Sequence, residues 1–515
     1  MKQPSYATFS HSGICLDLSP EEAPQDKWTG SQNIVFKETS SDRVGGYGDF
    51  HPAAMQNPIF CMMFVNTQNS YWLYVDAGGI RIMVTDGVTD WDITPAAPAL
   101  RTSESGDWTG TTLNGIPVLN NGLDTPLYWD GQTGNKCLRL PGWPANTTAN
   151  SVRAYKYHLV AMGITTNGVE FPHLVRWSSG ADPGTIPQEW TPTPTNDAGD
   201  VLVADTPGKC VDGLPLRDVF IIYKEFSTYV LQYVAGEYVF TARKLYLTSG
   251  IQANNCIAEI NGEHWVLTSN DVVKHDGQTF QSVVTNTVRN ALIQSINPAK
   301  IKQCCIVSRH NKQQIWVCIP TANNPWLNLA YTINAELGSV GTRDLPDVSF
   351  VARGVVSKGA IDTWDSDSSD WDSDTTFWNQ QTYSVNEDSV LMSSASANKL
   401  WAVDAISSAN GQAITAYLER TGLPIGDFLQ RKIMTRIVPR IEGAVGTVVY
   451  IRLGSQSIFD APVAWSDPVP YTLGTDIQVS SFAEGRLLAV RFESTGEAIW
   501  RLHSYRVEFV DQGLF

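Results

Sequence analysis

Apolar residues in this chain of 515 residues occur mostly in short runs that turn-forming residues interrupt. Residues 259–280 show the pattern clearly, because two apolar runs flank Asn261-Gly262 and a third follows a polar turn at 269–271. Asn-Gly between apolar runs favours a tight hairpin turn, since both residues tolerate a positive φ and the turn matches the twist of the strands. The stretch therefore predicts a three-stranded antiparallel meander.

The same spacing of apolar runs and turns recurs along the chain. Residues 112–131 carry turns at Asn114-Gly115 and Asn121-Gly122, and residues 71–94 carry a looser version. Between residues 58 and 400 we count about six or seven such units of about 40 to 50 residues, the length of a four-stranded propeller blade. We therefore predict an all-β fold with a β-propeller-like repeat domain over residues 58–400.

The predicted strands become longer from residue 401 onward. Val449, Ile451 and Leu453 alternate with outward-facing positions, as expected of a strand with one buried face. Residues 401–515 are therefore predicted to form a C-terminal β-sandwich. Residues 1–57 show little periodicity, and we predict an N-terminal arm that packs on the first blade or on a neighbouring subunit.

One segment has the period of a helix. Val288, Leu292 and Ile296 are spaced four residues apart. They follow Asn286 and Thr287, whose side chains can cap the first turn. We predict one short amphipathic helix here.

The net charge of the chain indicates which classes of molecule the protein can bind. Lys and Arg number 36 against 52 Asp and Glu, a formal net charge of -16. DNA affinity comes mainly from Lys and Arg that neutralise phosphates, so this protein is a poor DNA clamp, although it could enclose DNA without gripping it. The sequence has no apolar run of about 18 residues and begins without an apolar leader, so we predict no membrane span and synthesis in a cytoplasm.

No motif in the sequence selects a catalytic residue, a cofactor or a metal. The eight cysteines lack C-x-x-C spacing and are predicted to be buried, reduced thiols. Phosphate-binding loops, H-E-x-x-H and G-x-S-x-G are absent from the sequence. Residues 176–190 faintly resemble the Asp-box turn of sialidases through Ser179, Asp182, Gly184 and Trp190, but such a turn is structural and says nothing about activity.

Residues 362–378 form an acidic segment in which Trp-Asp-Ser-Asp occurs twice. Its central acidic residues are Asp365, Asp367, Asp370, Asp372 and Asp374. They lack the Gly turn and closing Glu of an EF-hand loop. Three interpretations stay open: a solvated loop anchored by its Trp side chains, a cation site, or an acidic surface that repels a negatively charged neighbour.

Several phrases of the sequence resemble one protein family. They are WTGSQNIVF (28–36), NGIPVLNNGLDTPLYWDG (114–131), the repeated WDSD, ERTGL (419–423), RLGSQ (452–456), APVAWSDP (461–468), EGRLLAVRFES (484–494) and WRLHSYRVEFVDQG (500–513). These are similar to the tail hub, tail nozzle or packaged-DNA stabilisation proteins of short-tailed bacteriophages. The resemblance touches both ends and the middle of the chain.

The resemblance implies a non-enzymatic virion protein that is built on a β-propeller and assembles as a homohexameric ring. Such a ring would bind the head–tail adaptor or portal and tail fibres or spikes, and would retain the double-stranded genome and conduct it during ejection. The protein would be assembled in the bacterial cytoplasm and reside in the phage tail. An acidic lumen suits this task, because each phosphate contact would add affinity and slow transit. The acidic residues of 362–378 are our candidates for facing the channel.

A propeller that binds or cleaves glycans is the alternative function. A glycosidase needs two carboxylates across a cleft, and a sialidase needs an arginine cluster with a Tyr nucleophile. The chain carries many acidic residues, and its arginines are spread over several predicted units: Arg153, Arg176, Arg217, Arg243 and Arg353. The sequence alone leaves open whether some of them converge.

Overall fold

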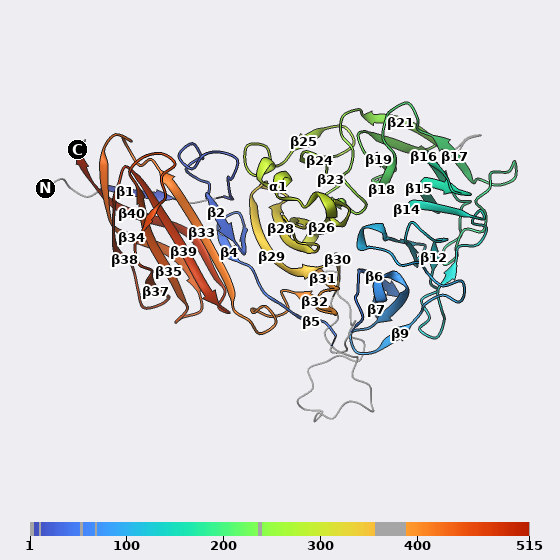
Figure 1. The fold of residues 1–515 in the computed structure, drawn as a ribbon, viewed down its shortest axis with the longest axis horizontal. Coiled ribbons are helices and arrows are strands. Elements are labelled where there is room, and N and C mark those ends of the chain that lie inside the picture. The colour runs from blue at the N-terminus through green and yellow to red at the C-terminus, as the bar shows by residue number, and fades with distance from the viewer. Residues whose placement is uncertain are drawn as a thin grey trace, which may run out of the picture.

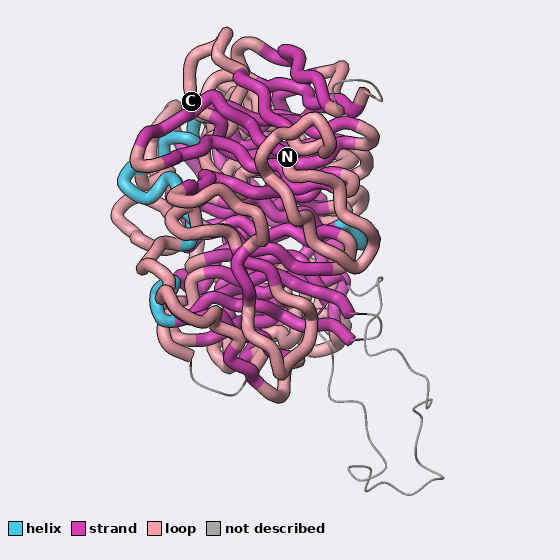
Figure 2. Tube along the Cα trace, turned by 90° about the vertical axis from the view of Figure 1, so that its right-hand side faces the viewer, coloured by secondary structure: helices cyan, strands magenta, loops and turns pink. Residues whose placement is uncertain are grey.

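The computed structural model describes residues 5–9, 12–51, 55–66, 69–234, 239–355 and 388–513. Strands dominate these residues and confirm the predicted all-β fold. Figure 2 shows strands filling the body, with helical segments at its margins. The helical segments are α1 (Arg289–Ser295) and the 3-10 turns η1 (Ala77–Gly79), η2 (Ser105–Asp107), η3 (Pro298–Gln303) and η4 (His310–Lys312). In the described ranges, none of the helices has the length and apolar character needed to cross a membrane.

The propeller, at the right of Figure 1, has seven antiparallel blades of four strands each; six blades are separate sheets, and blade 6 is one end of a larger sheet. Blade 1 consists of β6 (Phe60–Asn66), β7 (Asn69–Asp76), β8 (Arg81–Thr85) and β9 (Asp90–Asp92). Blade 2 consists of β10 (Thr109–Leu113), β11 (Ile116–Asn120), β12 (Leu127–Tyr128) and β13 (Leu138–Arg139). Blade 3 consists of β14 (Thr147–Tyr155), β15 (His158–Thr166), β16 (Val169–Trp177) and β17 (Gly199–Leu202). Blades 4 and 5 consist of β18 (Cys210–Leu216), β19 (Val219–Lys224), β20 (Thr228–Tyr233) and β21 (Phe240–Tyr246); and β22 (Ile257–Ile260), β23 (Glu263–Leu267), β24 (Val272–His275) and β25 (Phe280–Ser282).

Blades 6 and 7 complete the ring. Blade 6 consists of β26 (Cys305–Arg309), β27 (Gln314–Ile319), β28 (Leu327–Asn334) and β29 (Val340–Val348). Blade 7 consists of β30 (Phe350–Val355), β31 (Asp388–Ser394), β32 (Lys399–Val403) and, from the N-terminal region, β5 (Tyr47–Asp49). The last blade therefore joins a strand that precedes blade 1 to the last three strands of the propeller, which closes the ring with backbone hydrogen bonds.

Aromatic side chains seal the contacts where the ring closes. The ring of Phe60 in blade 1 lies 4.6 Å from that of Phe350 in blade 7 and 6.1 Å from that of Trp108, which precedes blade 2. All three side chains are buried. Burial of each such side chain contributes about 1.5–3 kcal/mol, so packing between blades is a major source of stability.

The C-terminal residues form a β-sandwich, at the left of Figure 1. One sheet contains β2 (Gly30–Gln32), β33 (Ile414–Leu423), β39 (Leu487–Gly496), β35 (Val448–Gln456), β36 (Ala464–Trp465) and β37 (Val469–Thr472). The facing strands are β1 (Ser5–Phe9), β40 (Trp500–Gly513), β34 (Arg431–Gly443) and β38 (Val479–Gly485). On β35, Val449, Ile451 and Leu453 are fully buried while Tyr450 is exposed, as the alternation predicted.

The N-terminal residues connect the sandwich to the propeller. Strands β3 (Ile34–Phe36) and β4 (Ser41–Arg43) lie between β29 of blade 6 and β40 of the sandwich, so that one ten-stranded sheet runs through both parts. The prediction of an arm on the first blade is therefore wrong for β3 and β4, whereas Phe50 and His51, later in the same segment, do contact blade 1 at Trp72 and Val88. Strands of three residues are too short for a periodic pattern to reveal their partners.

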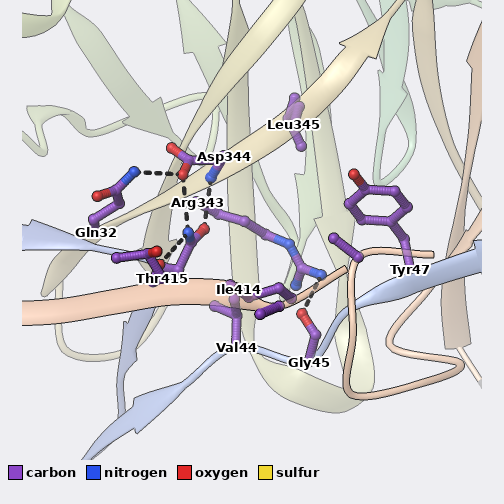
Figure 3. A pocket seen from close by; sticks show the side chains of 12 residues that line it. Gln32, Val44, Gly45, Tyr47, Arg343, Asp344, Leu345, Ile414 and Thr415 are labelled. Carbon is purple, nitrogen blue, oxygen red and sulfur yellow. Dashed lines mark hydrogen bonds between the residues drawn. The ribbon is translucent and has the colours of Figure 1, made fainter. Parts of the chain in front are cut away.

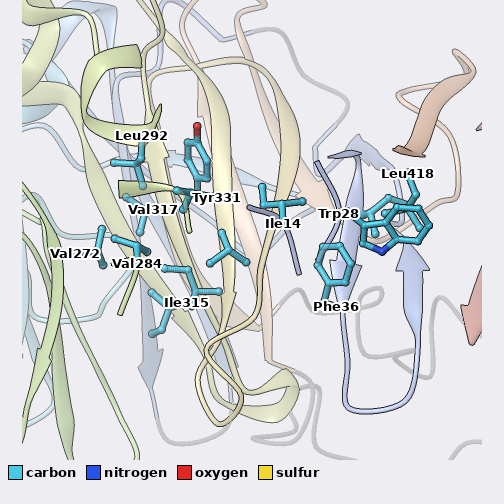
Figure 4. Close-up of a cluster of buried hydrophobic side chains, with 14 of the residues drawn as sticks. Ile14, Trp28, Phe36, Val272, Val284, Leu292, Ile315, Val317, Tyr331 and Leu418 are labelled. Atoms are coloured by element: carbon cyan, nitrogen blue, oxygen red, sulfur yellow. The ribbon is translucent and has the colours of Figure 1, made fainter. Parts of the chain in front are cut away.

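The hydrophobic core is also continuous from the propeller into the sandwich. In Figure 4, Val317 and Tyr331 of blade 6 lie on one side of Ile14, and Trp28, Phe36 and Leu418 lie on the other. All six side chains are buried, and Trp28 has no exposed surface. The two parts therefore share one continuous hydrophobic core.

The predicted helix is confirmed as α1, with Leu292 buried. Its predicted caps are wrong, because no side chain at the N-cap accepts a hydrogen bond from the first turn. Instead the carboxylate of Asp17, which is distant in sequence, accepts bonds from the amides of Asn290 and Ala291 at 3.1 and 3.0 Å. A cap that comes from elsewhere in the chain has no local sequence signal.

Candidate functional site

A cavity of about 420 Å³ lies on the axis of the propeller. The first strand of every blade contributes to its wall, which confirms that the seven blades surround one axis. Representative wall residues are Met62, Thr111, Arg153, Leu214, Ile257, Val307 and Ala352, one from each of blades 1 to 7. A volume of about 420 Å³ is that of a small-molecule pocket, so the cavity is far too small to admit a DNA duplex.

Two loops that precede distant blades of the ring contact each other. Gly106 in η2, before blade 2, approaches Lys302 in η3, before blade 6, so closely that a Cβ on Gly106 would lie 2.1 Å from the Lys302 carbonyl oxygen. The ammonium of Lys300 also lies 3.0 Å from the Glu104 carboxylate. Since blades 2 and 6 are not neighbours, this contact links two distant parts of the ring.

A buried ion pair beside the axis ties four blades together. The Arg153 guanidinium donates to both carboxylate oxygens of Asp212, with Nε to Oδ1 at 2.8 Å and a terminal nitrogen to Oδ2 at 2.5 Å. It also donates to the Gly110 carbonyl at 2.7 Å and to Asn255 Oδ1 at 2.9 Å. The side chain of Asp212 has no exposed surface and that of Arg153 is 8% exposed. All three guanidinium nitrogens of Arg153 thus donate hydrogen bonds, which connect blades 2 to 5.

A second charged cluster lies where blades 6 and 7 meet the N-terminal strands. Asp404 accepts from Arg309 at 2.7 Å, from Lys312 at 2.8 Å and from Arg343 at 2.9 Å. The two guanidinium groups also lie over the ring of Trp316, at 5.3 Å for Arg309 and 4.8 Å for Arg343. We call Asp404, Arg309, Lys312 and Arg343 the Asp404 cluster.

Burial and the excess of positive charge in the Asp404 cluster shift the pKa values of Asp404 and Lys312. Burial alone raises the pKa of Asp404, but the attraction of Arg343, Arg309 and Lys312 outweighs it and holds that pKa far below its ordinary value. Burial lowers the pKa of Lys312, and the repulsion of the two arginines adds to this effect against the attraction of Asp404. The single carboxylate therefore compensates three cations only in part.

The Asp404 cluster forms part of a cleft of about 870 Å³ between blade 6 and the sandwich. Six basic and four acidic side chains line this cleft, a net charge of +2 in a chain whose total is -16. The basic residues are Lys37, Arg43, Arg309, Lys312, Arg343 and Arg501, and the acidic residues are Glu38, Asp42, Glu336 and Asp404. The cleft is thus a local concentration of positive charge on an acidic protein.

Arg343 separates this cleft from a smaller cavity of about 240 Å³. Figure 3 shows its side chain reaching toward Gly45, whose carbonyl accepts at 3.0 Å. The neighbouring Asp344 accepts from Gln32 at 2.6 Å and from Asn33 at 2.9 Å. These bonds fasten the N-terminal strands to blade 6, so the smaller cavity is part of the structural joint.

Two histidines are buried at the contact between blades 4 and 5. Tyr223 Oη lies 2.9 Å from His264 Nδ1 and 2.6 Å from His275 Nε2, and His264 Nε2 lies 2.9 Å from the Pro215 carbonyl. His275 Nδ1 has no hydrogen-bond partner among the described residues. Burial lowers the pKa of each histidine to about 4, despite weak opposing attraction from nearby acidic residues. Both imidazoles are therefore neutral in the folded protein at pH 7.

We expect acid to destabilise the protein through these histidines. Their pKa is about 4 when folded against about 6.5 when unfolded, so the unfolded chain binds protons more tightly. Their contribution to stability is complete above pH 6.5 and is lost as the pH falls toward 4, at about 1–3 kcal/mol by pH 5.5. Urea unfolding at several pH values should give a flatter dependence for His275→Gln than for the wild type. Parallel curves for the two proteins would contradict this assignment.

Of the five arginines that the sequence left open, Arg153 and Arg353 both line the axial cavity, and the other three lie elsewhere on the propeller. The guanidinium of Arg153 is paired with Asp212, and Arg353 lines the axial cavity from β30 of blade 7. Arg176 pairs with Asp200 at 3.3 Å, Arg243 lies on the outer strand of blade 4, and Arg217 has a positive φ in the turn before β19. This arrangement brings no sialidase-like arginine cluster together in the part of the chain that the structure describes.

The acidic candidates Asp365, Asp367, Asp370, Asp372 and Asp374 lie outside the described residues, and their channel-facing role stays a prediction. The Asp-box-like segment lies between the third and fourth strands of blade 3, where Trp190 is buried against Trp143 at 4.5 Å. All eight cysteines are buried and unbridged. The described ranges hold no group of three His, Cys, Asp or Glu side chains suited to a metal ion.

Sequence reasoning missed the two charged clusters. The sequence holds an indication of Asp212, because this residue is a carboxylate within the otherwise apolar run CVDGLPL. Such a residue is buried only if it is paired. Nothing in the sequence indicates that Asp404 is a buried partner of Arg309 and Arg343, because these arginines are distant in the sequence and belong to no motif.

No protein-family model matches this chain, and no curated protein matches it. Among solved structures, it is similar to the β-propeller domain of Cps50 (Swd1) from Myceliophteria thermophila, with 9% identity, a TM-score of 0.39 and coverage of 70% of this chain and 99% of that one. It is also similar to YCF48 from Cyanidioschyzon merolae, with 8% identity, a TM-score of 0.36 and coverage of 70% and 98%. A third similarity is to PorZ of Porphyromonas gingivalis, with 10% identity, a TM-score of 0.35 and coverage of 83% of this chain but only 46% of that protein.

Proposed function

We propose that this protein is a structural subunit of a phage tail nozzle or hub ring, built from six copies, whose acidic channel retains and then conducts genome DNA. The observation that carries the proposal is the union of propeller and sandwich through one ten-stranded sheet and one continuous core, in a chain with a net charge of -16. A wall that surrounds pressurised DNA needs rigidity and must not bind phosphates. The protein acts in the phage tail and performs no catalysis.

The DNA channel of this proposal lies between copies and not inside one copy. The axial cavity of about 420 Å³ inside one copy is too small for a duplex. A ring of six chains carrying -16 each gives a lumen that repels the backbone of DNA. The acidic residues of 362–378 are the proposed lining of that lumen.

Exposed apolar side chains at opposite ends of the molecule support a head-to-tail ring. Phe171 on β16 and Leu202 on β17 are 43% and 62% exposed, and Phe482 on β38 is 60% exposed. These strands lie at the two ends of the long axis in Figure 1. Contacts between two different surfaces of the same chain produce closed rings when the rotation between copies closes.

We expect the purified protein to form hexamers at high concentration, as measured by multi-angle light scattering across a dilution series. Leu202→Glu should shift the equilibrium toward monomers, while Val88→Glu, at an exposed apolar position between β8 and β9, should not. A protein that stays monomeric at every concentration and cleaves host glycans would contradict the proposal and favour the alternative enzyme class. The proposed binding of the ring to an adaptor, fibres or spikes requires that the rings form.

A further inference from the structure

The charges of the Asp404 cluster are unbalanced in the described structure. Three cations share one carboxylate, which leaves the cluster with a net charge of +2. Arg309 is 3% exposed and Arg343 is 5% exposed, so water screens little of this excess. Uncompensated charge with little access to water is costly, and an additional anion would relieve it.

Hydrogen-bond donors also remain available around the cluster. Arg309 Nε is buried and has no acceptor in the described part of the chain. Lys312 is 42% exposed at the cleft, and its ammonium carries three donors, one of which reaches Asp404. The cluster thus offers an anion its net positive charge and the accessible ammonium donors of Lys312, in a cleft of about 870 Å³, while the buried Nε of Arg309 is left without an acceptor among the described residues.

We propose that this cleft binds one free phosphate-class oxyanion against Lys312 and Arg309. A dianion would balance the +2 charge of the cluster. The acidic residues Glu38 and Glu336 are exposed at the same cleft and disfavour an extended polyanion such as a DNA backbone. Phosphate is therefore the proposed ligand, and its binding would stiffen the joint between propeller and sandwich.

Isothermal titration with inorganic phosphate tests the site, with sodium chloride at equal ionic strength as the reference. We expect saturable binding of one phosphate per chain and a rise in the unfolding temperature that chloride does not reproduce. Lys312→Met should weaken the affinity by about tenfold or more, because a charge-assisted hydrogen bond is lost. Lys312→Arg should retain most of it.

Lys244→Met is the matched control, because Lys244 is 41% exposed and pairs with one carboxylate, Asp205, away from the cleft. It should bind phosphate like the wild type. The proposal is overturned if phosphate stabilises no better than chloride, or if Lys312→Met binds phosphate as tightly as the wild type. Displacement of phosphate by a short DNA duplex would also overturn it, since the site would then recognise backbone phosphates.

Discussion

Replacing Asp404 with asparagine is expected to lower the free energy of unfolding by about 3–5 kcal/mol. The substitution keeps the shape of the side chain but removes the carboxylate that contacts Arg309, Lys312 and Arg343. Two of these cations are almost fully buried, and their desolvation then has no opposite charge to offset it. The cluster joins blade 6, blade 7 and the N-terminal strands, so the loss should affect closure of the ring.

Guanidinium-induced unfolding, followed by Trp fluorescence, measures this loss. Asp205→Asn is the control, because Asp205 is an exposed partner of Lys244, and exposed pairs contribute little. A midpoint for Asp404→Asn that matches both the wild type and this control would show that the cluster does not stabilise the joint.

The second large effect is expected from Asp212→Asn, also at about 3–5 kcal/mol. This carboxylate balances the charge of Arg153 and also accepts from the amides of Gly213 at 2.9 Å and Asn255 at 3.0 Å. Its loss leaves a buried guanidinium beside the axis and two backbone donors with weaker acceptors. Blades 2 to 5, which Arg153 connects, should loosen together.

Hydrogen exchange locates this second effect. Amides of β14 and β18 should exchange faster in Asp212→Asn, while those of β34 and β40 in the sandwich should keep their protection. Asp200→Asn, which removes a partly exposed pair with Arg176, should leave the exchange of both regions unchanged. Uniformly faster exchange throughout the chain would argue against a local role for the pair.

The repeating part of the fold could be predicted because its determinants are local. Asn261 and Gly262 both have positive φ, as the hairpin between β22 and β23 requires. Alternation on β35 likewise predicted which side chains are buried. The insertion of β3 and β4 between blade 6 and the sandwich could not be predicted, since three-residue strands carry no period and their partners are distant in sequence.

The charged sites could be predicted only in part. Asp212 is conspicuous within its apolar strand, whereas Asp404 gains its role from residues that the ring brings together. The cap of α1 by Asp17 is another contact that no local pattern reveals. Sequence patterns thus recover strands and turns, but the ionic contacts that fasten blade to blade depend on closure of the whole ring.

Cryo-electron microscopy of the purified protein at assembly concentration tests the central claim most directly. The account predicts sixfold rings with an opening wide enough for a DNA duplex and with residues 362–378 facing that opening. Single molecules without any closed assembly, or rings whose lumen is lined by Lys and Arg, would contradict it.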